Sequence, residues 1–147
     1  MKDLGSIIRT KFWERLNGLE YAEDTYLNVY DSASVPANVN PPYVTIGTFL
    51  STELGEGSKQ SYGQECILLL EVITKASNSY GGKELADVIS NEVIELCRTR
   101  QSGYFDLSPD FQLISILLEN TQTIEDLVET GLISRRLIRF RLKVHQL

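Results

Sequence analysis

Apolar residues recur at spacings of three and four near the start of the chain and again past its middle. This period places them along one side of a helix, so it predicts helices over residues 2–19 and over Gly82–Cys97. The first apolar stripe comprises Leu4, Ile7, Ile8, Phe12, Leu16 and Leu19, and the second comprises Leu85, Val88, Ile89, Val93, Leu96 and Cys97. The second helix carries its acids outside that stripe, on the face expected to be solvated: Glu84, Asp87, Glu92 and Glu95.

Strand patterns lie between the two helices. Residues 25–30 and 43–50 predict the first two strands, and residues 66–74 predict a third that is apolar on both faces. Such a run is typical of a central strand covered on both sides, and with only two helices available one cover is expected from a neighbouring subunit. Replacing Leu70 or Val88 by Asp is predicted to prevent folding, because each lies at the centre of an apolar pattern.

Prolines and glycines predict the connections. Proline fixes φ and donates no backbone hydrogen bond, so Pro36, Pro41 and Pro42 predict an extended crossing over residues 31–42, outside the central ladder. The Gly- and Ser-rich residues 51–63 predict a polar loop that is mobile in the free subunit.

The last third of the chain predicts two further strands, over residues 111–118 and from Ser134 onward. In the second of these, Ile138, Phe140, Leu142 and Val144 alternate with Arg139, Arg141, Lys143 and His145. That alternation indicates a half-buried strand with one cationic face. The intervening residues 119–133 fit either a capped helical turn or a long two-stranded arm that turns near Gly131.

These elements predict an α+β fold in one domain over residues 1–147. The expected architecture is a mostly antiparallel sheet of four or five strands with two helices on one face. The predicted element order is α-β-β-β-α-β-β, and residues 119–133 are a candidate projecting arm.

The charge is unevenly distributed. The net charge is −6, but residues 1–134 hold all twenty acids against nine bases, whereas residues 135–147 hold five bases and no acid. This split suggests that the C-terminal segment contacts something acidic, and that partner can be another copy of the chain. No apolar run approaches the roughly 20 residues that cross a bilayer, and the N-terminus lacks the apolar core of a signal peptide, so we expect a protein without membrane contact that folds in a cytoplasm.

Candidate chemistry is sparse. Cys66 and Cys97 lie within apolar patterns and are predicted to be buried, inert thiols. His145 is the only histidine and has no cysteine or carboxylate at ligand spacing. The sequence has no nucleophile elbow, phosphate-binding loop or dinucleotide motif. We therefore predict no catalytic residue, no cofactor and no metal site, and a protein that is not an enzyme.

Four residues are candidates for contacts with other proteins. Trp13 falls beside the first apolar stripe and predicts either a flank of the core or a subunit contact. For Arg139, Arg141 and Lys143 there are three interpretations: a sheet edge kept soluble by charge, contact with acids of another protein, or binding to nucleic acid. The first two are favoured, because the chain is acidic overall and no aromatic residue interleaves the exposed positions.

The order of these features resembles a known family. The segments that carry the resemblance are Val29-Tyr30-Asp31, Val35-Pro36 and Pro42-Tyr43-Val44-Thr45-Ile46-Gly47. They follow an amphipathic helix and precede a polar hairpin loop, an apolar strand and a second amphipathic helix. Over residues 7–97 this arrangement is similar to the tail terminator, or tail completion, family of long-tailed bacteriophages. The length of residues 119–133 and the charged final strand depart from that family.

The resemblance implies a structural function. Such a protein forms a ring, commonly of six subunits, on the last ring of the major tail tube protein, and offers the surface to which a head-completion or neck protein joins. DNA passes through the ring without specific binding. The protein would reside at the tail–neck junction of the virion after assembly in the host cytoplasm. The alternatives are a head-completion or adaptor protein of the neck, a small ligand-binding or enzymatic α+β domain, and a nucleic-acid-binding protein.

Overall fold

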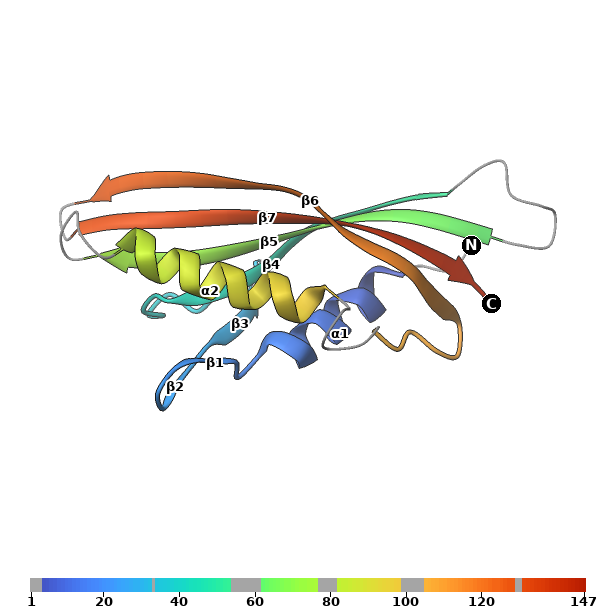
Figure 1. Cartoon of the computed structure of the whole chain (residues 1–147), viewed down its shortest axis with the longest axis horizontal. Coiled ribbons are helices and arrows are strands. Elements are labelled where there is room, and N and C mark those ends of the chain that lie inside the picture. Colours follow the sequence, from blue (N-terminus) through green and yellow to red (C-terminus); the bar gives the residue numbers. More distant parts are fainter. Residues whose placement is uncertain (1–3, 33, 54–61, 77–81, 99–104, 129–130) are drawn as a thin grey trace.

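Two helices lie against one face of a five-stranded sheet in the computed structural model, which describes residues 4–32, 34–53, 62–76, 82–98, 105–128 and 131–147 (Figure 1). The helices are α1 (Gly5–Leu16) and α2 (Gly82–Cys97). The strands are β1 (Glu20–Ala22), β2 (Thr25–Tyr26), β3 (Asn28–Asp31), β4 (Tyr43–Glu53), β5 (Tyr62–Ala76), β6 (Phe111–Val128) and β7 (Gly131–Gln146). The predicted α+β class with two helices and a mostly antiparallel sheet is confirmed.

The strand order in the sheet is β3-β4-β5-β7-β6, and every neighbouring pair is antiparallel except β3 and β4. The element order differs from the prediction, because β1 and β2 form a separate two-stranded sheet before β3. The single strand predicted over residues 25–30 is therefore wrong: the ladder breaks at Leu27, which is buried between β2 and β3. Residues 32–42 carry the chain back to the parallel β4 and, where described, lie outside every strand, as their prolines predicted.

The buried residues confirm the predicted apolar stripe of α1 but differ from the predicted stripe of α2. Ile8, Phe12 and Leu16 are fully buried. In α2 the residues turned to the sheet include the small Ala86 and Ser90, whereas Val88 is 43% exposed. The prediction that Val88 belongs to the core was wrong, because a 3.6-residue period defines a broad stripe without fixing its centre. The acids Glu84, Asp87, Glu92 and Glu95 are exposed, as predicted.

The cationic strand lies inside the sheet. β7 pairs with β5 on one side and β6 on the other over nearly its whole length. Its apolar residues Ile138, Phe140, Leu142 and Val144 are buried, as the alternation predicted. The interpretation of Arg139, Arg141 and Lys143 as charges that protect a sheet edge is therefore wrong, since β6 forms that edge.

Residues 119–133 take the two-stranded alternative, and the helical turn is wrong. The ladder between β6 and β7 continues to the pair Val128 and Gly131, whose positive φ of 142° suits glycine at this reversal. The loop predicted over residues 51–63 is strand at both ends, where β4 and β5 extend further than expected. Its remaining residues 54–61 lie outside the described residues, as do residues 129–130.

Candidate subunit interface on the open face of the sheet

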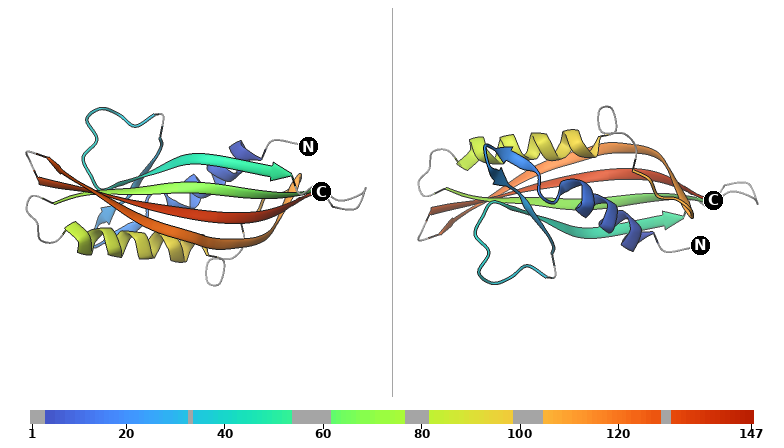
Figure 2. Two further views of the ribbon diagram at one scale, coloured as in Figure 1. Left: turned by 90° about the horizontal axis from the view of Figure 1, so that it is seen from above. Right: turned by 90° about the horizontal axis from the view of Figure 1, so that it is seen from below.

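Both helices of the described residues lie on the same face of the sheet, so the described part of the chain places no helix on the other face. Figure 2 shows the strands in front of the helices from above, and both helices in front of the strands from below. Leu70 and Phe140 point to the helices, so the residues that alternate with them point away. We call this surface the open face, and by register it includes Leu50, Glu65, Ile67, Leu69, Glu71, Leu117, Leu137, Arg139, Arg141 and Lys143.

The centre of the open face is apolar. Leu50 of β4 is 56% exposed, and Ile67 and Leu69 on the neighbouring β5 are half-buried. Leu117 of β6 is 52% exposed and is separated from Ile67 by Arg141 of β7. Leu50 lies opposite Ile67 in the ladder, so the two side chains adjoin on the same face. This arrangement agrees with the prediction that β5 is apolar on both sides. Leu50 and Leu117 were not among the predicted interface residues, although each continues the alternation of its strand.

Ion pairs cross the open face on either side of this centre. The Arg141 guanidinium donates to Glu119 and to Glu65, and Arg135 donates from Nη2 to Glu71 Oε2 at 2.9 Å. The hydrogen bonds that Arg141 donates to Glu119 and Glu65 raise the pKa of Arg141, and the bond that Arg135 donates to Glu71 raises the pKa of Arg135. Arg141, a predicted interface residue, therefore already has two carboxylate partners within its own subunit.

Arg139 and Lys143, the other two predicted interface cations, remain available on this face. Neither makes a hydrogen bond or ion pair with any residue in the described part of the chain. In the ladder Arg139 lies between Leu69 and Asn120. Its side chain borders a hollow of about 370 Å³ that is also lined by Thr48, Leu50, Ile67, Leu69, Glu119 and Asn120. An apolar hollow with a free cation at its border suits a protein partner that presents an apolar side chain beside an acid.

Trp13 lies in the other layer, on α1. Its side chain is 45% exposed, and Nε1 donates to the Val29 carbonyl oxygen at 3.0 Å. The indole thereby joins α1 to β3. The structure does not bring Trp13 together with the predicted arginines, so any contact it makes with another subunit is separate from the open face.

Trp13→Phe is expected to lower the free energy of unfolding by about 1 kcal/mol. The variant keeps a large ring but leaves the Val29 carbonyl without its donor, and a hydrogen bond of this kind contributes on that order. Denaturant unfolding followed by circular dichroism measures the loss. An unchanged midpoint and slope of the unfolding curve would show that water replaces the indole N–H as the donor to the Val29 carbonyl without loss of stability.

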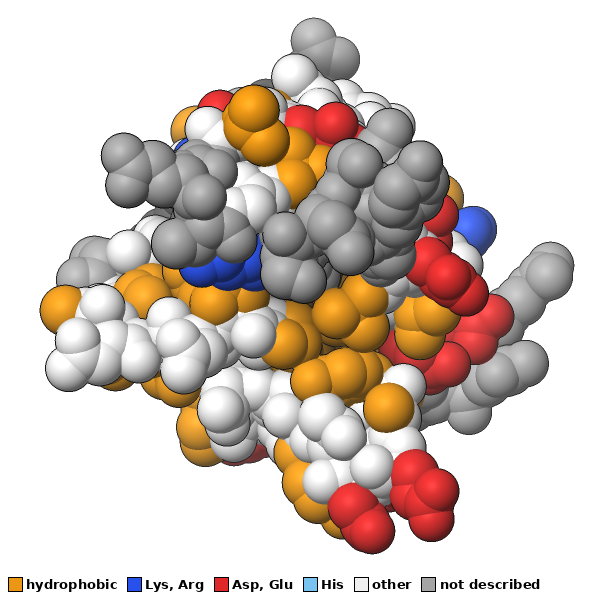
Figure 3. All heavy atoms as spheres, turned by 90° about the vertical axis from the view of Figure 1, so that its left-hand side faces the viewer, with side chains coloured by type: hydrophobic (Ala, Val, Ile, Leu, Met, Phe, Trp, Pro, Cys, Tyr) orange, Lys and Arg blue, Asp and Glu red, His pale blue; other side chains and the backbone are white. Residues whose placement is uncertain are grey.

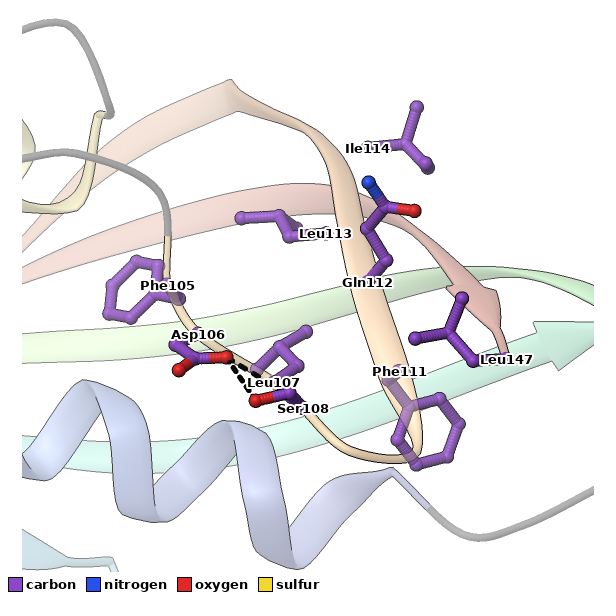
Figure 4. A pocket seen from close by; sticks show the side chains of 9 residues that line it. All are labelled: Phe105, Asp106, Leu107, Ser108, Phe111, Gln112, Leu113, Ile114 and Leu147. Atoms are coloured by element: carbon purple, nitrogen blue, oxygen red, sulfur yellow. Dashed lines mark hydrogen bonds between the residues drawn. The ribbon is translucent and has the colours of Figure 1, made fainter.

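A second hollow, of about 480 Å³, lies where β6 begins and β7 ends (Figure 4). Its walls are mostly apolar, with Phe105, Leu107 and Phe111 among them. The acid at its border is already engaged, because Asp106 Oδ1 accepts hydrogen bonds from the Ser108 hydroxyl at 2.6 Å and the Ser108 backbone N–H at 3.0 Å. These bonds lower the pKa of Asp106. Gln112 is the other polar side chain in the lining, so the described residues supply few of the convergent polar groups that orient a small ligand.

Other chemistry is equally limited in the described residues. They contain no group of three His, Cys, Asp or Glu side chains placed to hold a metal ion. Cys66 and Cys97 are free and buried, as predicted, and burial raises the pKa of both thiols. No described helix has both the length and the apolar character needed to cross a bilayer.

The fold and this surface define a two-layer α+β protein with one sheet face uncovered. A chain of a solved structure, the "Virion of native gene transfer agent (GTA) particle", has a similar fold, with a TM-score of 0.59 over 80% of this chain and 78% of that one. The two sequences are 21% identical, so the likeness concerns the fold. No family model matches the chain, and no curated protein matches it.

Proposed function

We propose that this protein is a structural component of a phage-like virion, a tail terminator that forms a ring of six copies on the end of the tail tube. The observation that carries the proposal is the uncovered apolar and cationic sheet face, on a fold similar to that of a chain in a gene transfer agent virion. A fold alone does not define a function, so the surface supplies the argument.

The proposed mechanism is the matching of surfaces. Soluble monomers rarely leave a contiguous apolar patch uncovered, and exposed leucines beside unpaired cations favour burial against another protein. A ring requires two different patches on each subunit, so that one copy contacts the next head to tail. One rim of that ring would fit the tail tube protein and the other rim the neck protein. DNA would pass through the hole, where a protein of net charge −6 has little attraction for phosphates.

The test is an assembly experiment with the tail tube protein of the same particle. We expect the added protein to cap one end of each growing tube and to stop elongation, which negative-stain electron microscopy and the tube-length distribution measure. Thr10→Ala is the control, because Thr10 is exposed on α1 outside the open face, so this variant should cap equally well.

Three other outcomes would contradict this proposal. Binding to DNA-filled heads but not to tube ends would favour the neck adaptor. Salt-sensitive binding to duplex DNA with neither partner bound would favour the nucleic-acid interpretation. Tubes that elongate without limit in the presence of the protein would exclude the terminator.

A further inference from the structure

The outward side of α2 carries an acidic stripe. Its exposed residues recur at helical spacing and are Glu84, Asp87, Val88, Asn91, Glu92 and Glu95. No basic residue occurs between positions 84 and 97. Asp87 pairs with Arg136 of β7, which ties the helix to the sheet and leaves the other acids directed outward. Figure 3 shows acidic side chains gathered on its right, on the side of the molecule where α2 lies.

Val88 is out of place in this stripe. It is exposed, it lies one turn from Glu84 and one turn from Glu92, and it contributes little to the core of its own subunit. An apolar side chain between two acids is the complement of the open face, where an apolar hollow adjoins Arg139 and where Lys143 is also free.

We propose that the acidic stripe of α2 in one copy docks on the open face of the next copy. In this contact Val88 lies over Ile67, and Glu84 and Glu92 approach Arg139 and Lys143. The inference rests on the proposed ring and names the contact between its subunits. Because the helix layer and the open face are on opposite sides of the molecule, the contact is head to tail and generates a closed ring when the rotation between copies is right (Figure 1).

The spacing of the charges supports this pairing. Arg139 and Lys143 are four strand residues apart on the same face, or about 13 Å at 3.3 Å per residue. Glu84 and Glu92 are eight helix residues apart, or about 12 Å at 1.5 Å per residue. With the helix axis along β7, each acid can therefore face one cation.

The apolar contact falls at the midpoint of the same alignment. Val88 is midway between the two acids in the sequence of α2. Arg141 is midway between the two cations, and its neighbour in the ladder is Ile67. Arg141 is held by Glu65 and Glu119, so its guanidinium does not compete for the acids of α2.

The first test is charge reversal in solution. A sheet variant carries Arg139→Glu with Lys143→Glu, and a helix variant carries Glu84→Lys with Glu92→Lys. Each variant alone is expected to assemble at least tenfold more weakly than wild type, because like charges then meet at every contact. Native mass spectrometry and sedimentation measure assembly, with and without tail tubes.

The equimolar mixture of the two variants is expected to regain assembly. The acidic sheet of one variant then meets the basic helix of the other, and the unchanged faces also match, so the copies alternate around the ring. Glu20→Lys with Glu23→Lys is the control reversal, since both acids are exposed on or beside β1 and belong neither to the acidic stripe nor to the open face, and it should leave assembly unchanged.

The second test is cross-linking of engineered cysteines. Ile67→Cys and Val88→Cys variants, mixed and oxidised, are expected to give disulfide-linked dimers, whereas either variant alone should give none. The native thiols of Cys66 and Cys97 are buried and should not react. Dimers from either variant alone would indicate a symmetric contact and overturn the proposal.

The outcomes separate this contact from the ring itself. If both charge-reversal variants form rings as readily as the wild-type protein, the proposed contact is wrong and the proposed function still stands. If the wild-type protein stays monomeric at millimolar concentration and also forms no ring on tube ends, both the proposed function and the proposed contact are wrong. Unchanged assembly with loss of a salt-sensitive DNA affinity in the sheet variant would assign the open face to nucleic acid.

Discussion

Leu70→Asp is expected to abolish folding. Leu70 is fully buried in the middle of β5, where its neighbours in the ladder are Ile46 and Ile138. An aspartate at this position would have no cationic partner, and a buried unpaired carboxylate costs several kcal/mol. That penalty is a large part of the roughly 5–15 kcal/mol that stabilises a typical domain. Soluble yield and thermal unfolding followed by circular dichroism measure the effect.

Val88→Asp is the control with the same change of chemistry. Because Val88 is exposed on α2, its aspartate variant should fold and melt cooperatively, with a free energy of unfolding within about 1 kcal/mol of wild type. The sequence predicted that both substitutions would be equally harmful. A soluble Leu70→Asp variant that melts cooperatively would show that β5 does not pass through the core as described.

Periodicity predicted the elements well where one strong local pattern governed them. The alternation in β7 and the bounds of α2 could be predicted because each depends only on nearby residues. The orientation of α2 could not, since small residues such as Ala86 and Ser90 add little to an apolar pattern but allow the helix to lie close to the sheet. The hairpin of β1 and β2 was missed because both strands are too short to show a period.

Sheet order depends on pairing between distant segments, and this limited the prediction of the candidate interface. The cationic strand was predicted from its own sequence, but its place between β5 and β6 follows from register, which local sequence does not specify. The same register brings Glu65 and Glu119 to Arg141 and leaves Arg139 and Lys143 without partners in the described residues. The sequence therefore indicated a cationic surface, whereas the structure distinguishes its free cations from its paired one.

Phe12→Ala is expected to lower the free energy of unfolding by about 3–5 kcal/mol. Phe12 is fully buried on α1, and its ring stacks on Phe105 with centroids 4.5 Å apart and lies 6.1 Å from the ring of Phe140. It thus joins α1, the segment before β6 and the centre of β7. Removing the ring leaves a cavity among three elements that are held in place by their own contacts, so collapse can recover little of the loss.

Thr10→Ala is the control on the same helix, because Thr10 is exposed and its loss should change stability by no more than about 0.5 kcal/mol. Phe12→Leu should fall between the two, since leucine fills most of the space but forms no ring stack. Urea unfolding of the three variants tests this order. A loss of less than 1 kcal/mol in Phe12→Ala would mean that α1 is not anchored through this ring. In that case α1 would be held mainly by its contact with α2, where Arg15 donates a hydrogen bond to the Leu96 carbonyl oxygen at 3.2 Å.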